Sequence, residues 1–155
     1  MDFKQELKFD FTPDFQDDII KLVLTHKEGY KLMGYIHPEY FTLTSSALIF
    51  EVIDQFYKKD KRVPGQVLLL EKVTKIFRQK EYAKTFDTTE QKEILNKAKI
   101  LSEGNVRDSD VLIEKAISFA KYVEVTHVLE NVDVTNVDDY ENLLRSLSKA
   151  MTIAR

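Results

Sequence analysis

The chain has 155 residues and a net charge of −3, and its 43% of hydrophobic residues are enough for a core and exclude wholesale disorder. It contains no cysteine, which excludes disulfide bonds and thiolate chemistry, and only four glycines and three prolines, which favours long helices over a sheet with many turns. The first residues lack the basic and apolar regions of a signal peptide, and no apolar run approaches the roughly 18 residues of a membrane span, so we expect a cytoplasmic protein.

The negative charge is concentrated in the last third of the chain. Residues 106–155 carry nine Asp or Glu and six Lys or Arg, whereas the two signs balance in residues 1–105. A domain that grips nucleic acid through its own surface usually carries a basic stripe. The charge distribution therefore argues against direct binding of nucleic acid.

Hydrophobic residues recur at helical spacing in seven segments. Thr12-Pro13-Asp14 predicts the first helix start, because a hydroxyl cap is followed by proline and an acid in the first turn. Residues 44–46 predict a capping segment for the third helix, and Thr88 or Thr89 a cap for the fifth. The predicted helices cover residues 13–26, 29–36, 44–59, 66–79, 91–101, 109–131 and 138–154.

The segment 122–137 allows two interpretations. It is rich in β-branched residues and alternates in places, which is typical of a pair of strands. The spacing of apolar residues in the preceding segment continues into it as far as Val123, and an isolated pair of strands is only marginally stable. We therefore predict a helix, and an all-α fold for the whole chain.

The predicted architecture is a globular helical head, residues 1–105, followed by a helical hairpin, residues 106–155. The first hairpin helix is apolar on most sides, so one narrow partner helix does not cover it. Either the head covers the remainder, or a second copy of the chain does, and we favour the second copy. The residues predicted to form this self-association interface are Leu112, Ala116, Phe119, Val123, Tyr140, Leu144, Leu147 and Met151. Leu112, Phe119 and Leu147 are expected to matter most, with Phe119→Asp weakening the dimer but leaving helicity intact.

No motif in the chain predicts catalysis. The four glycines do not form the phosphate-binding loop of nucleotide hydrolases, and no Gly-x-Ser-x-Gly sequence supports a serine nucleophile. His26, His37 and His127 lack the spacing of metal ligands. The pairs Asp17-Asp18 and Asp138-Asp139 lie in first turns of predicted helices, where acids complement the helix dipole. We therefore predict no catalytic, cofactor or metal site.

Two further groups of residues have a structural and a functional interpretation. The cationic run 58–62 could contact phosphates or an acidic protein, but cations at a helix C-terminus also stabilise its exposed carbonyls. Tyr40 and Phe41 could stack on bases, but an aromatic pair before a helix more often fills a core. We favour the structural interpretation for both.

The order of these parts resembles the N-terminal domain of replicative DNA helicases of the DnaB family. Pro38-Glu39-Tyr40-Phe41 matches an element that follows the second helix in that family, and Ile49-Phe50 matches a pair within the third. Tyr57-Lys58-Lys59 matches the end of that helix, and Val63-Pro64 is similar to the form found in tailed phages.

The likeness extends to the C-terminus with one departure. Residues 136–155 resemble the last hairpin helix, just before the linker to the motor domain. The His-Arg pair of the bacterial proteins is replaced by Ala47-Leu48, which puts bacterial partner contacts at these positions in doubt.

The resemblance implies an assembly and partner-docking domain without activity of its own. In relatives, hairpins pair into dimers, three dimers form a collar, and the collar docks primase or a helicase loader. DNA would be contacted only through the full-length ring, and a motor domain that uses ATP and Mg²⁺ is expected beyond Arg155. The alternative is a free-standing helical adaptor, such as a phage protein that binds a replication factor in the host cytoplasm.

Overall fold

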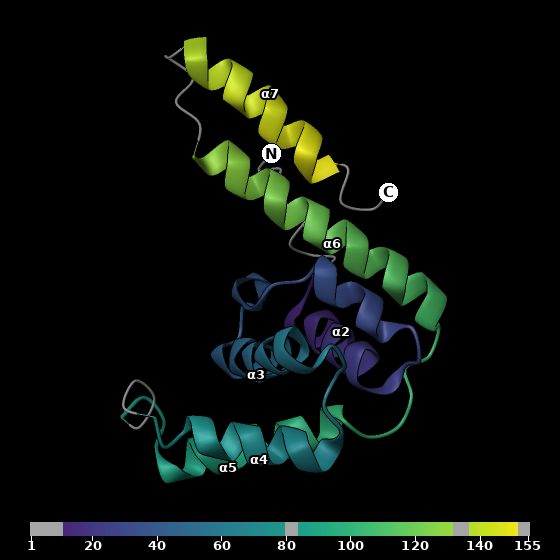
Figure 1. Ribbon diagram of the computed structural model, residues 1–155, viewed down its shortest axis with the longest axis vertical. Helices are drawn as coiled ribbons and strands as arrows, with labels where there is room; N and C mark the ends of the chain where they lie inside the picture. The colour runs from purple at the N-terminus through teal and green to yellow at the C-terminus, as the bar shows by residue number, and fades with distance from the viewer. Residues whose placement is uncertain (1–10, 80–83, 132–136, 152–155) are drawn as a thin grey trace.

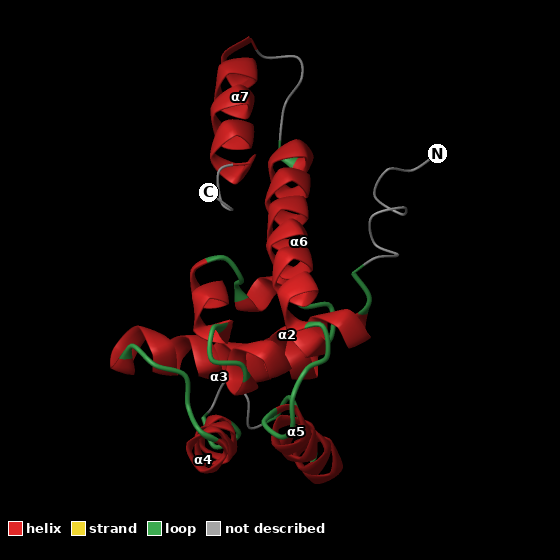
Figure 2. Ribbon diagram, turned by 90° about the vertical axis from the view of Figure 1, so that its right-hand side faces the viewer, coloured by secondary structure: helices red, strands yellow, loops and turns green. Residues whose placement is uncertain are grey.

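The computed structural model describes residues 11–79, 84–131 and 137–151, and every regular element in these ranges is a helix (Figures 1 and 2). The all-α prediction is therefore confirmed, and residues 122–130 are helical rather than extended. Residues 132–136 of the ambiguous segment lie outside the described ranges. The elements are α2 (Pro13–Thr25), η1 (Gly29–Gly34), η2 (Pro38–Tyr40), α3 (Thr44–Asp60), α4 (Gln66–Ile76), α5 (Thr88–Leu101), α6 (Ser109–Glu130) and α7 (Val137–Met151), where η denotes a 3₁₀ helix.

The helix starts confirm one predicted cap and correct two others. Thr12 caps α2, with its Oγ1 accepting a hydrogen bond of 3.2 Å from the backbone N–H of Phe15. The cap of α5 is Asp87 rather than a threonine, since its carboxylate and Glu90 form a reciprocal capping box. Leu43 precedes α3 without a side-chain cap, because the nearby Ser46 hydroxyl is used in tertiary contacts.

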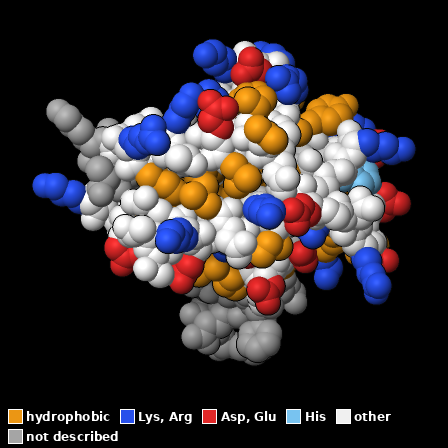
Figure 3. Space-filling view, turned by 90° about the horizontal axis from the view of Figure 1, so that it is seen from below, with side chains coloured by type: hydrophobic (Ala, Val, Ile, Leu, Met, Phe, Trp, Pro, Cys, Tyr) orange, Lys and Arg blue, Asp and Glu red, His pale blue; other side chains and the backbone are white. Residues whose placement is uncertain are grey.

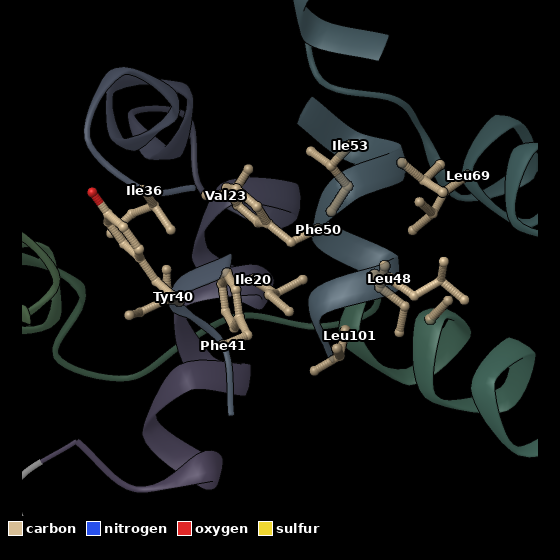
Figure 4. Packing of buried hydrophobic residues seen from close by; sticks show 14 of the residues in the cluster. Ile20, Val23, Ile36, Tyr40, Phe41, Leu48, Phe50, Ile53, Leu69 and Leu101 are labelled. Atoms are coloured by element: carbon tan, nitrogen blue, oxygen red, sulfur yellow. The ribbon is translucent and has the colours of Figure 1, made fainter. Parts of the chain in front are cut away.

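Helix α2 lies at the centre of the head. It contacts η1, α3, α5 and α6, and its apolar face is buried through Ile19, Ile20, Leu22 and Val23. Figure 4 shows Ile20 and Val23 facing Phe50 and Ile53 of α3, with Leu69 of α4 and Leu101 of α5 at the far side of the same cluster. One continuous core therefore joins α2, α3, α4 and α5.

Helices α2 and η1 approach each other at Gly29. A Cβ atom at this position would lie 2.0 Å from the carbonyl oxygen of Leu22, closer than van der Waals contact allows. Glycine is therefore required here to bring η1 against α2.

The hairpin is attached to the head through the first half of α6. Ala116, Phe119 and Ala120 are buried in the same core as the head, whereas the second half of α6 runs beyond it (Figure 1). Helix α7 lies antiparallel beside that projecting half (Figures 1 and 2). The predicted pair of C-terminal helices is present, and α6 shares its buried residues with the core of the head. The division of the chain into two units at residue 105 remains a prediction.

Candidate protein–protein interface

The described residues hold no group of three or more side chains that could ligate a metal ion. None of the described helices has the length and apolar composition needed to cross a bilayer. A depression of about 590 Å³ lies between η2, α3 and Phe86, and its charged groups include the ion pair of Asp54 with Lys58, 2.9 Å apart. These described features do not bring together a recognisable set of catalytic side chains.

Asp17 belongs to a polar network that ties three helices together. Its carboxylate accepts a 2.6 Å hydrogen bond from the Ser46 hydroxyl of α3 and lies 3.2 Å from the Lys97 ammonium of α5. Lys97 also donates to Ser46 over 2.7 Å. The neighbouring Asp18 has a raised pKa, first because burial disfavours its charge and then because Asp17 is close. This acid pair has a structural role, and the side chains of Asp138 and Asp139 lie outside the described residues.

The aromatic pair before α3 fills the core, as expected from the sequence. Phe41 packs on Phe50 with ring centroids 4.9 Å apart, and Tyr40 is only 7% exposed. The Tyr40 ring meets Phe119 edge-on at 6.2 Å, and its hydroxyl donates a hydrogen bond to the Glu124 carboxylate. Burial, with help from this carboxylate, raises the pKa of Tyr40 above its ordinary value. Tyr40 thus anchors η2 to the middle of α6.

Three residues of the cationic run at the end of α3 have structural contacts, which differ from the predicted stabilisation of the helix-end carbonyls. Lys58 pairs with Asp54, and this hydrogen bond raises the pKa of Lys58. Lys61 ends the helix in the left-handed conformation, with φ of 59°, and its backbone N–H bonds to the Tyr57 carbonyl. The Arg62 guanidinium lies over the Phe56 ring at 5.2 Å. Lys59 has no such structural contact among the described residues.

The predicted interface residues fall into two groups, and the first requires a correction. Ala116 and Phe119 are 0% and 2% exposed, because they pack against the head of their own chain. Phe119 meets Phe11 at 5.1 Å and Phe15 at 6.3 Å. These two residues belong to the intramolecular core, so they do not offer a surface to a second copy. Leu112 and Val123 are half-buried at the edge of this core.

The second group remains accessible on α7. Tyr140 is 50% and Leu144 69% exposed, while Leu147 is half-buried. The side chain of Met151 lies outside the described residues. Leu129, which is 49% exposed near the end of α6, was not among the predicted interface residues. The exposure of Leu129 follows from its position on α6, beyond the residues that the head covers. The sequence does not show where the head ends along α6, so it gave no sign of this exposure.

The projecting part of the hairpin, residues 125–131 of α6 together with α7, has no interior of its own. After Ala120, none of the side chains that the structure describes is buried. Two helices in contact cover each other on one side only, so the apolar residues on their outer sides remain in water. The projecting hairpin is therefore the leading candidate for a protein–protein interface.

Comparison with protein-family models, with curated proteins and with solved structures found no match. The likeness to DnaB-family helicases therefore rests on the sequence motifs, and the interface on the geometry of the hairpin.

Proposed function

We propose that this chain is an assembly and docking domain whose projecting hairpin pairs with the hairpin of a second copy. The observation that carries the proposal is the lack of any buried side chain among the described residues after Ala120. Leu129, Tyr140 and Leu144 are about half exposed or more on these two helices. A second hairpin placed against them would complete a four-helix arrangement with an interior.

The energetics favour such pairing. Full burial of one exposed leucine contributes about 1.5–3 kcal/mol, and a two-fold interface counts each residue twice. Large apolar side chains clustered on a monomer surface are typical of interaction sites. A contact of this kind is self-complementary, because the same residues face each other across the two-fold axis.

We further propose that the assembly is the collar of a hexameric replicative helicase of the DnaB family, which docks primase or a helicase loader. The motif Pro38-Glu39-Tyr40-Phe41 and the order of helices, a head followed by a terminal pair, support this assignment. Reading the gene downstream of Arg155 tests it. We expect several hundred further codons with a phosphate-binding loop; a stop codon directly after Arg155 would favour a free-standing adaptor instead.

Sedimentation velocity over a range of concentrations tests the self-association. The wild type is expected to form dimers or higher species, and Leu144→Asp to shift it toward the monomer, because a carboxylate would be buried in the interface. Leu144 is 69% exposed, so helicity should stay close to the wild-type value, and thermal stability should match that of the wild type at concentrations where the wild type is monomeric.

Val67→Asp is the matched control for this experiment. Val67 is an 80% exposed apolar residue on α4, at the end of the molecule opposite the hairpin (Figure 1). It should leave the sedimentation profile unchanged. A monomeric wild type, or dissociation by Val67→Asp but not by Leu144→Asp, contradicts assembly through the hairpin.

A further inference from the structure

A groove of about 270 Å³ lies between the C-terminal parts of α3 and α4. Its apolar side is formed by Val52, Phe56 and Ile76, whose side chains are largely buried and only 5–8% exposed. Its remaining lining is polar and exposed. These polar residues are Gln55, Lys59, Asp60, Lys72, Lys75 and Gln79.

The groove lies within the most basic part of the chain. Residues 58–79 hold seven Lys or Arg and two Asp or Glu, whereas the whole chain has a net charge of −3. Lys59 and Lys72 face the groove from opposite helices, and neither ammonium has a hydrogen-bond or ion-pair partner among the described residues. Lys75 pairs with Glu71 at 3.0 Å, but both side chains are more than half exposed, so this pair is weak and easily exchanged.

The charge of the groove is not needed for the fold. Lys58, Lys61 and Arg62, in the same basic segment, have structural contacts at the end of α3. Lys59 and Lys72 have none among the described residues. The lining holds Lys59, Lys72 and Lys75 against one carboxylate, Asp60, so it keeps an excess of positive charge beside a small apolar wall. This combination fits a ligand that carries both carboxylates and an apolar side chain.

We propose that this groove docks an acidic peptide segment of a partner protein, with one apolar side chain of the peptide seated between Phe56 and Ile76. Carboxylates of the peptide would pair with Lys59 and Lys72 on the two rims. A volume of about 270 Å³ suits one large side chain and its neighbours rather than a whole helix.

A nucleic acid fits the groove less well than a peptide. Nucleic acid affinity grows with the number of phosphates neutralised, and three lysines offer few such contacts. The net charge of −3 and the pI of about 5.7 add long-range repulsion for a polyanion. An apolar wall at the base of the groove also adds nothing to phosphate binding.

This inference deepens the docking part of the proposed function by giving the partner's chemistry, yet it does not depend on self-association. The groove lies on α3 and α4, and the hairpin surface lies on α6 and α7. Failure of one proposal therefore leaves the other intact. Leu144→Asp is expected to retain peptide binding in full.

Fluorescence anisotropy with the intact chain tests the groove. The probe is a labelled peptide of the form Asp-Glu-Asp-Leu-Phe-Asp-Glu, and a second peptide has serine in place of leucine and phenylalanine. We expect micromolar binding of the first peptide, weakening by about tenfold or more for the Lys59→Glu/Lys72→Glu double variant. The serine peptide should bind about tenfold more weakly than the first, since the apolar contact is lost.

Lys92→Glu is the matched control, because this exposed lysine lies on α5, outside the groove. It should bind the first peptide as the wild type does, and circular dichroism should show all variants folded. The proposal is overturned by no binding at about 1 mM protein, by equal binding of both peptides, or by loss of binding in Lys92→Glu alone. A labelled single-stranded oligonucleotide that binds more tightly than the first peptide, with the same dependence on Lys59 and Lys72, would overturn it in favour of nucleic acid.

Discussion

At the scale of single residues, Tyr40 connects two parts of the molecule that are far apart in sequence. Its ring is held between His37, at 5.2 Å, and Phe119, and its hydroxyl donates to Glu124 on α6. The neutral phenol makes this bond as donor, whereas a phenolate beside the Glu124 carboxylate would be repelled. Burial of the phenol, and then the Glu124 carboxylate, favour the protonated form in the folded state, and together they raise the pKa of Tyr40.

Tyr40→Phe is expected to lower the free energy of unfolding by about 1–2 kcal/mol at neutral pH, because the bond to Glu124 is lost. The folded-state pKa lies above the unfolded value of about 10, so the contribution of this phenol is complete below pH 10 and is lost as the pH rises above it. Urea unfolding of both proteins between pH 7 and pH 11 measures the difference, which should shrink above about pH 10. A difference that stays constant or grows with pH contradicts the assignment.

At the scale of elements, α6 performs two tasks with one continuous helix. Its first half is a core helix that packs on α2 and η1, and its second half extends beyond the head to pair with α7. Both halves carry apolar residues, so the sequence pattern alone does not separate them. Phe119 lies where the two halves meet, in a cluster with Phe11, Phe15 and Tyr40.

Phe119→Ala is expected to destabilise the monomer by about 3–5 kcal/mol, because it leaves a cavity in this aromatic cluster. Phe119→Asp should therefore unfold the head rather than selectively separate two copies. Leu144→Ala, at an exposed position of α7, should change stability by less than about 0.5 kcal/mol. Thermal unfolding of the two alanine variants compares them directly. A small loss of stability in Phe119→Ala would contradict its place in the core and would favour the predicted role of Phe119 in the self-association interface.

At the scale of the whole molecule, both ends expose apolar residues, and they are formed by different helices. The hairpin end presents apolar residues of α6 and α7, whereas the other end is formed by α4 and α5 (Figures 1 and 2). Figure 3 looks at this second end and shows apolar side chains with both Lys or Arg and Asp or Glu side chains distributed around them. Val67 and Ile100, 80% and 53% exposed, lie in these two helices. An assembly through the hairpin would leave the α4 end and its groove accessible to other partners.

Truncation after Asn131, which removes α7, is expected to leave the head folded, since no described side chain beyond Ala120 is buried. The urea-unfolding free energy should fall by no more than about 1–2 kcal/mol, the contribution of half-buried contacts between α6 and α7. Sedimentation of the truncated chain should show loss of the self-association. Wholesale unfolding would instead show that α7 is part of a single cooperative unit.

Much of the fold was accessible from the sequence because helix formation depends on local signals. The spacing of apolar residues located all the described α-helices, and Thr12 was identified as a cap from its neighbours alone. The cap of α5 was predicted at Thr88 or Thr89, one or two residues late, since Asp87 and the threonines are all good capping residues and only the geometry separates them. Helix α4 ends at Ile76, three residues before its predicted end at residue 79, because no strong stop signal lies there.

The sequence by itself determined that the chain is helical, that its aromatic pair before α3 fills a core, and that the last helices carry more apolar surface than one partner helix covers. Only the tertiary structure decided which part of that surface is covered. The head buries Ala116 and Phe119 but ends before Leu129, so the apolar residues beyond it stay in water. The reason is that periodicity specifies which face of a helix is apolar, whereas burial depends on how far neighbouring elements extend along it. The same holds for the groove, because Lys59 and Lys72 are 13 positions apart and meet only through the packing of α3 on α4.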